Sequence, residues 1–308
     1  MATERLRLIL DVDTGTDDAM ALAFAVRSPA AELVAATTVA GNVPLPLTFE
    51  NTRRVLHHLG AGDVPVHRGF GRPLVRPPLD ARHVHGESGL GELVLPPAER
   101  GADRPSAPDL LVERITATPG EITLVCVGPL TNLAAAIALE PALPEVIGRL
   151  VVMGGALGRG NVTPHAEFNI HVDPEAAAQV FAACRLTLVG LDVTERAALT
   201  RAGWERLAGL DTPEGRLVYG VNAGRFREPD RNESYLHDPL AVGVALDPSL
   251  CERRRGVLTV DTGDSPTAGR VMLEERADGP HEVCVGVDTP RFLDHFARAL
   301  GLPALPGR

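Results

Sequence analysis

Four carboxylates stand within eight residues near the start of the chain, at Asp11, Asp13, Asp17 and Asp18. The apolar run 6–12 predicts a strand, and the helical spacing of apolar residues over 17–27 predicts a helix, so the cluster lies where the two meet. Ligands of open α/β sheets bind beyond the carboxyl ends of the strands. A helix N-terminus supplies only about half a positive charge, too little for four carboxylates. We therefore expect a bound cation, and oxygen ligands favour Ca²⁺ or Mg²⁺ over zinc.

Three other interpretations of this segment are worth testing. In the simplest, Asp17 and Asp18 cap the helix and Asp11 is a solvated strand end. An EF-hand loop counted from Asp11 fails, because its sixth residue would be Thr16 and its twelfth Leu22, where Gly and Glu are needed. A haloacid-dehalogenase-type phosphatase would use Asp11 as nucleophile and Asp13 as acid/base, but it leaves the pair at 17–18 without a role.

Polar residues elsewhere could complete a site. His237 precedes Asp238-Pro239, which predicts a helix start, and an imidazole there could act as a general acid near neutral pH. In the loop 160–169, Asn161, Glu167 and Asn169 suit sugar hydroxyls, although turns and caps would use the same residue types. The HxH pair at 83–85 could ligate zinc, but no third ligand stands nearby.

The elements that must position these residues alternate along the chain. Strands are predicted at 6–12, 33–40, 64–66, 122–127, 150–153 and 186–191, separated mostly by helical segments, which favours a parallel sheet with helices on both faces. Residues 68–108 are predicted to be a long irregular excursion. Short strands at 257–260, 270–274 and 283–287 predict a small antiparallel C-terminal extension before a terminal helix. We expect one α/β domain over 1–308, with an open, mostly parallel sheet.

Composition excludes several classes of protein. The formal net charge is −10, which disfavours a nucleic-acid or anionic-membrane partner. All 30 basic residues are Arg, so neither a lysine Schiff base nor a Walker A lysine is present. Four dispersed cysteines suggest a reducing compartment, and no apolar run reaches the ~20 residues of a membrane helix. We expect a soluble, cytoplasmic protein.

Taken together, these segments resemble the inosine–uridine-preferring nucleoside hydrolase family. The matching motifs follow the same order along nearly the whole chain: DVDTGTDDA at 11–19, TTVAGN at 37–42, HVHGESG at 83–89, VGPLTN at 127–132, VVMGGA at 151–156, the loop 161–169 and HDP at 237–239. The resemblance implies a single-domain α/β fold, a tightly bound Ca²⁺, a homodimer or homotetramer, and hydrolysis of the N-glycosidic bond of a ribonucleoside.

The resemblance also implies a role for each matching residue. The calcium ligands would be Asp13, Asp18, Asp238 and the backbone carbonyl of Val127, where the family often has Thr. Asp13 would also be the general base towards water, and His237 would protonate the leaving base. Asp11 and Asn42 would support this arrangement. Substrate contacts would come from Asp17, Asn42, His85, Met153, Asn161, Glu167 and Asn169.

Base preference is less constrained. Purine-specific relatives stack the base between tryptophans, whereas the single Trp204 lies away from the motif loops. The resemblance therefore favours uridine and inosine, or broad specificity. The segment 219–236 could form a lid over the base or a plain amphipathic helix. A non-catalytic nucleoside-binding protein is the remaining alternative, although binding alone needs neither a base at Asp13 nor an acid at His237.

Overall fold

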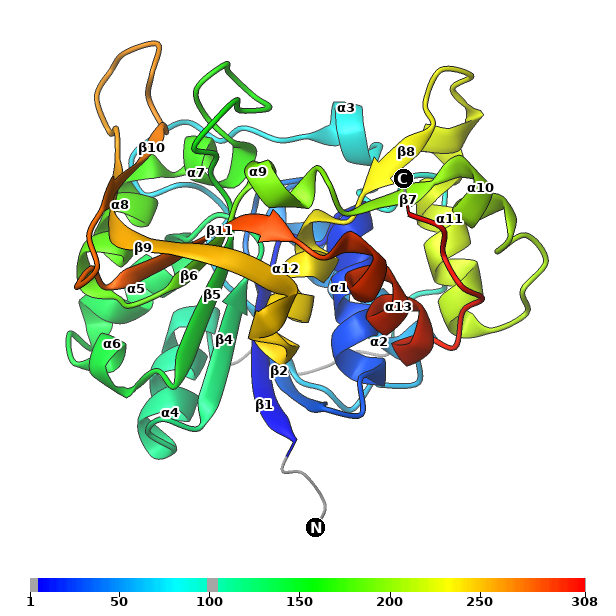
Figure 1. Cartoon of the computed structure of the whole chain (residues 1–308). Coiled ribbons are helices and arrows are strands. Elements are labelled where there is room, and N and C mark those ends of the chain that lie inside the picture. The colour runs from blue at the N-terminus through cyan, green and yellow to red at the C-terminus, as the bar shows by residue number, and fades with distance from the viewer. Residues whose placement is uncertain (1–4, 99–104, 308) are drawn as a thin grey trace.

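One nine-stranded sheet organises the computed structural model, which describes residues 5–98 and 105–307 (Figure 1). Its strand order is β10-β9-β11-β6-β5-β4-β1-β2-β3. Neighbours from β11 to β3 are parallel, whereas β9 is antiparallel to both β11 and β10. The strands are β1 (Leu6–Val12), β2 (Ala31–Thr38), β3 (Val66–Arg68), β4 (Ile122–Cys126), β5 (Arg149–Met153), β6 (Thr187–Val189), β9 (Cys251–Val260), β10 (Val271–Glu275) and β11 (His281–Val287). The predicted α/β class, with its antiparallel extension, is confirmed.

Helices cover both faces of the sheet because the strands are apolar on both sides. In β1, Leu8 and Leu10 belong to one core cluster and Ile9 to the other, as alternate side chains of a strand must. The helices that contribute buried residues to the first cluster are α1 (Thr16–Arg27), α2 (Leu45–His58), α11 (Pro213–Arg227), α12 (His237–Leu246) and α13 (Thr289–Ala299). The second takes α4 (Ala107–Ala117), α5 (Thr131–Leu139), α6 (Leu143–Val146) and α8 (Pro174–Ala183). Among the described helices, none has the length and apolar character to cross a membrane.

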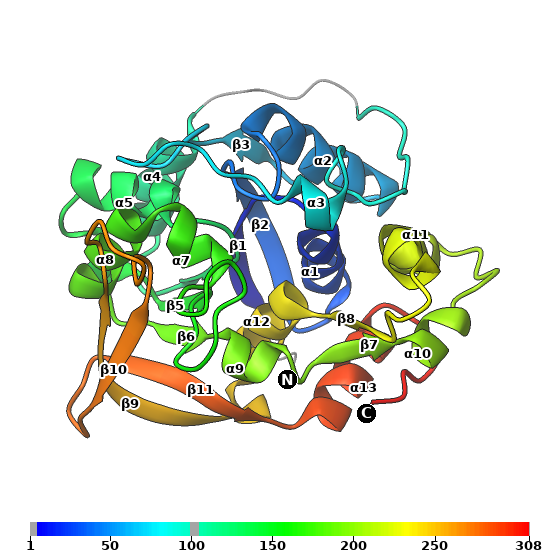
Figure 2. The same cartoon turned by 90° about the horizontal axis from the view of Figure 1, so that it is seen from above.

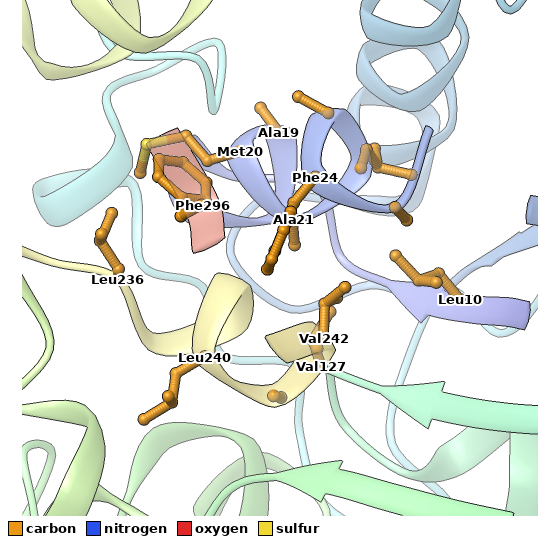
Figure 3. Packing of buried hydrophobic residues seen from close by; sticks show 14 of the residues in the cluster. Leu10, Ala19, Met20, Ala21, Phe24, Val127, Leu236, Leu240, Val242 and Phe296 are labelled. Atoms are coloured by element: carbon orange, nitrogen blue, oxygen red, sulfur yellow. The ribbon is translucent and has the colours of Figure 1, made fainter. Parts of the chain in front are cut away.

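The packing of α1 against α12 joins the two ends of the sequence. Alanine recurs along α1, and Ala241 and Ala245 of α12 are buried in the same core cluster, so the two helices pack closely. Figure 3 shows Met20 and Phe24 of α1 in the cluster that also holds Val242 of α12. The Phe24 ring meets Phe296 of α13 edge to face, with ring centroids 5.4 Å apart. This core sets the distance between the N-termini of α1 and α12.

Several elements differ from the sequence-based expectations. β9 begins at Cys251, well before the predicted start at 257, because Arg253, Arg254 and Arg255 hid its strand character. These arginines form cross-strand ion pairs with Glu282 and Glu275. A separate two-stranded sheet was not predicted; it consists of β7 (Ala198–Thr200) and β8 (Glu233–Tyr235). Other short helices are α3 (Arg82–His85), α7 (Phe168–Val172), α9 (Leu191–Thr194), α10 (Arg201–Glu205) and the 3₁₀ turn Pro248–Leu250.

The carboxyl ends of the parallel strands meet at one edge of the sheet, below α3, α7 and β8 (Figures 1 and 2). Asn132, at the start of α5, ties three segments together at this edge. Its amide donates to Asp11 Oδ1 at 2.7 Å and to the Thr38 carbonyl at 3.1 Å, and its Oδ1 accepts the Phe70 N–H at 2.9 Å. A side chain at Gly69 would displace it, because a Cβ there would lie 2.0 Å from Asn132 Oδ1.

Replacing this buried amide is expected to be costly. Asn132→Ala leaves the Phe70 N–H without its partner and removes one of the two donors to Asp11 Oδ1, so we expect the free energy of unfolding to fall by about 2–4 kcal/mol. Chemical denaturation measures the change. Thr116→Ala, which removes an exposed hydroxyl from α4, is the control and should change stability by less than about 0.5 kcal/mol. A similarly small change in Asn132→Ala would contradict the role given to this residue.

Candidate functional site

Three carboxylates converge where α1 and α12 begin. One oxygen from each of Asp17, Asp18 and Asp238 lies within 4.8 Å of the other two. Asp18 and Asp238 are 0% and 3% exposed, and Asp17 retains 13% of its side-chain exposure. Residues far apart in the sequence are therefore brought together, as expected for a shared cation.

Asp13 lies outside that group of three but is linked to it. Its own N–H donates to Asp18 Oδ1 at 3.0 Å, and Asp13 Oδ2 accepts the Asn42 N–H at 2.7 Å. Asp13 Oδ1 is buried and has no hydrogen-bond partner among the described residues. Glycine is needed beside it, because a Cβ at Gly41 would lie 2.0 Å from Asp13 Oδ2. The chain thus leaves one oxygen of Asp13 available.

Asp18 also caps α1, as the simplest interpretation of the acidic segment expected. Its Oδ2 accepts the Gly15 N–H at 2.9 Å and an Asn42 amide hydrogen at 3.0 Å, so it caps α1 while it faces the cluster. The other half of that interpretation is wrong, since Asp11 is 0% exposed rather than solvated. Asp11 Oδ1 accepts from Thr37 at 2.6 Å and from Asn132.

The cluster is electrostatically unfavourable without a counter-charge. Burial, followed by the neighbouring Asp17, raises the pKa of Asp18 from 3.8 to about 7. Burial and the adjacent carboxylates raise the pKa values of Asp13 and Asp238 well above their ordinary range. Asp13 Oδ1 and Asp17 Oδ1 are both buried without partners. An all-oxygen donor set with unpaired atoms fits a hard divalent cation, so these residues form a possible acidic metal site.

The backbone carbonyl of Val127, the fourth expected ligand, follows β4 at the same edge. It borders the cavity and accepts an amide hydrogen of Asn169 at 2.7 Å. A carbonyl oxygen has two lone pairs, so this bond leaves one available. The same Asn169 amide also reaches the Met153 carbonyl at 3.2 Å, which connects β4 with β5.

A cavity of about 160 Å³ opens beside the carboxylates. Every residue expected to touch substrate lines it, together with the neighbouring catalytic and metal candidates: Asp17, Asn42, His85, Val127, Met153, Asn161, Glu167, Asn169, His237 and Asp238. Asp13 and Asp18 lie behind this lining rather than in it. The structure therefore brings the residues expected to touch substrate together around one cavity, whereas Asp11 is not among the residues that line it.

Two lining residues also hold their own loop in shape. Glu167 caps α7, because its carboxylate accepts the N–H groups of Asn169 and Ile170, and it also accepts the Gly155 N–H at 2.8 Å. Burial raises the pKa of Glu167, against the lowering effect of these bonds. Asn161 Oδ1 accepts the Phe168 N–H at 3.0 Å, which leaves its amide hydrogens without a partner among the described residues.

The two histidines of the cavity are held differently. The Thr16 N–H donates to His85 Nδ1 at 3.1 Å, so that nitrogen is unprotonated and the proton of the neutral ring is on Nε2. His237 Nδ1 lies 2.7 Å from the Thr194 hydroxyl. Burial lowers the pKa of both rings, that of His237 to about 4. His237 is therefore neutral at pH 7 in this structure, where the sequence had suggested a group that titrates near neutrality.

Some lining residues have no individual role in substrate binding among the sequence-based expectations, although His83 belongs to the HxH pair and the candidate lid segment 219–236 includes three of them. The lining also contains Thr16, Ala81, His83, Val84, Phe168, Arg225, Ser234 and Tyr235. Tyr235 could have been suspected from its place two residues before His237, and its ring lies 5.5 Å from that imidazole. Arg225 is one of several polar residues on α11, and Thr194 is remote in sequence from His237, so neither had a signal. The segment 219–236 contains the end of α11 together with β8.

The phosphatase alternative does not fit this geometry. A nucleophile must reach its substrate, but Asp11 is fully buried, binds Thr37 and Asn132, and is absent from the cavity lining.

Comparison with known proteins agrees with the site. The family model described as inosine-uridine preferring nucleoside hydrolase matches residues 8–294. The chain is 37% identical over 279 residues to the pyrimidine-specific ribonucleoside hydrolase RihB of Escherichia coli strain SE11, covering 88% of each chain. A plant nucleoside hydrolase, the PpNRh1 enzyme, superposes with a TM-score of 0.90 at 33% identity, covering 97% of this chain and 100% of the other. A purine-preferring ribonucleoside hydrolase from Gardnerella vaginalis gives 0.90 at 34% identity, covering 96% and 98%. This chain therefore belongs to the inosine-uridine preferring nucleoside hydrolase family and is a nucleoside N-ribohydrolase.

Proposed function

We propose that this hydrolase requires Ca²⁺ and acts on uridine and inosine, or more broadly on ribonucleosides, to give ribose and the free base. The observation that carries the proposal is the convergence of Asp17, Asp18 and Asp238 beside a cavity lined by amide and imidazole groups. Asp13, hydrogen-bonded to Asp18 through its backbone, adds an unpaired oxygen. A non-catalytic binding protein would have no use for such a strained cluster.

The acidic residues and the Val127 carbonyl would hold the ion. Ca²⁺ bound by Asp13, Asp18, Asp238 and Val127 would supply the positive charge that gathers the ribose hydroxyls and a water molecule. The RihB relatives are named pyrimidine-specific and a structural relative is named purine-preferring, so family membership alone leaves the base open.

The side chains of the protein would move protons and bind the ribose. Asp13 Oδ1, free of hydrogen bonds, would accept the proton of the attacking water. Asp17, Asn161 and Glu167 would hold ribose, and carboxylates beside the sugar would stabilise the positive charge that develops on the ring. His237 is neutral at pH 7, so it must first take up a proton from solvent before it can act as the acid. Negative charge that builds up on the departing base raises the pKa of the ring and favours this uptake, and the imidazolium then transfers the proton to the base as the N-glycosidic bond breaks.

The dependence on a cation can be measured through stability alone. In a chelator, the raised pKa of Asp18 means that the folded state holds a proton that the unfolded state has lost. The free energy of unfolding should therefore be highest below pH 4 with respect to this group and fall as the pH rises to about 7. Calcium should remove this decline and raise the melting temperature at pH 7.

Asp18→Asn supplies the matched comparison. It removes one negative charge, so in chelator at pH 7 it should melt above the wild type, whereas in calcium it should melt below. If calcium shifts the melting temperature of both proteins equally, Asp18 is not a ligand.

The reaction itself is tested with inosine, uridine and p-nitrophenyl phosphate. We expect free ribose from the nucleosides and no phosphate release. Asp13→Ala should lose turnover, about 10³-fold or more, and keep the circular dichroism spectrum of the wild type. Near-normal ribose release by this variant would remove Asp13 from the role of base.

His237→Ala should affect substrates unequally. Loss of a general acid typically costs about 10²- to 10⁴-fold, so kcat/KM for uridine and inosine should fall by that range. p-Nitrophenyl riboside, whose leaving group needs no proton, should lose far less. Equal losses on all three substrates would show that His237 positions the substrate rather than donating a proton.

A further inference from the structure

The substrate cavity has two chemically different ends. Carboxylates and amides from the strand ends form one, where a ribose would be held. The other is formed by His85 on α3, Arg225 on α11, Tyr235 at the end of β8 and His237 at the start of α12. Since the acidic end is matched to ribose hydroxyls, the base of a bound nucleoside must occupy the second end.

Arg225 has no hydrogen bond or ion pair with any described residue, unlike Arg227 on the same helix and Arg231 just after it. Arg227 forms an ion pair with Glu92 at 2.7 Å, and Arg231 forms one with Glu228 at 3.0 Å. Arg225 is partly buried and borders both the substrate cavity and an adjoining one that contains Arg82 and His83. An unpaired guanidinium in the wall of a cavity is available to a ligand.

The fixed groups at this end donate hydrogen bonds. A guanidinium has five N–H donors and cannot accept. His85 Nδ1 is already occupied by the Thr16 N–H, so the neutral ring presents its Nε2–H. Most carboxylate and amide side chains that line the cavity lie on elements at the sugar end, namely Asn42, Asn161, Glu167, Asn169 and Asp238, whereas Asp17 Oδ1 reaches to 3.9 Å from His85 Nδ1. Arg225 and His85 therefore present only donors to the base, whereas the hydroxyls of Ser234 and Tyr235 in the same lining can both donate and accept.

We propose that Arg225 is a specificity-determining residue that selects bases carrying a carbonyl oxygen where others carry an amino group, namely uracil over cytosine and hypoxanthine over adenine. The inference rests on the proposed function and deepens it. A carbonyl accepts from the guanidinium, whereas an exocyclic amino group places donor against donor. The same positive charge stabilises the negative charge that develops on the carbonyl oxygens as the base departs.

The test compares kcat/KM for uridine with cytidine and for inosine with adenosine, in wild type, Arg225→Gln, Arg225→Lys and Arg227→Gln. A glutamine both donates and accepts, so it should tolerate either base. The wild type should favour the carbonyl-bearing nucleoside of each pair by about 10- to 100-fold, the range expected for a hydrogen bond to a charged group. Arg225→Gln should bring each ratio to within about threefold of unity, and Arg225→Lys should keep part of the preference.

Arg227→Gln is the matched control, because it removes the same charge from the same helix outside the cavity lining. It should leave both ratios unchanged. Inhibition by free uracil and by free cytosine provides a second readout, and Arg225→Gln should weaken inhibition by uracil selectively. Equal wild-type rates within both pairs, or ratios that survive Arg225→Gln, would overturn the inference while leaving ribonucleoside hydrolysis intact. Release of no ribose from any of the four nucleosides would instead overturn the proposed function, and the inference with it.

Discussion

Mutual repulsion among buried carboxylates is the constraint on which this structure depends. Asp13, Asp18 and Asp238 sit in a low-dielectric environment, each raising the cost of ionising another. A fold retains buried, mutually repelling carboxylates only where another interaction offsets their unfavourable free energy. A cation bound by these carboxylates would offset it, and the same cation would bind the substrate. The acidity of the site and its need for a cation are therefore two aspects of one arrangement.

The rest of the architecture holds this cluster in place. Close packing of the alanine-rich α1 against α12 fixes Asp18 opposite Asp238, which neither helix could do alone. Asn42 then binds Asp13 through its backbone and Asp18 through its side chain, so the segment that follows β2 also contributes. Glycine at position 41 provides the space in which Asp13 fits. The strand ends and these short hydrogen bonds hold the carboxylates more rigidly than an exposed loop would.

The fold class and the location of the acidic site could be predicted from the sequence. The acidic run at 11–18 follows an apolar strand, so the strand-end rule located the site before any fold was known. The partnership of that run with Asp238 came from resemblance, because the distance between residues so far apart in sequence depends on how α1 and α12 pack. β9 was predicted too short because its arginines mask a strand at the antiparallel end of the sheet. Arg225 escaped notice for a similar reason: α11 carries several polar residues, and only the folded chain shows which of them faces the cavity.

The aromatic stack behind α11 gives this protein a built-in optical reporter. Trp204 stacks on Tyr219 at 4.6 Å and on Phe226 at 5.1 Å, and Phe226 is the next residue after Arg225. As the sole indole of the chain, Trp204 is the only source of tryptophan emission. Any displacement of α11 when a ligand enters would alter the stacking and hence the emission wavelength, so the movement of the helix can be followed in solution without a label.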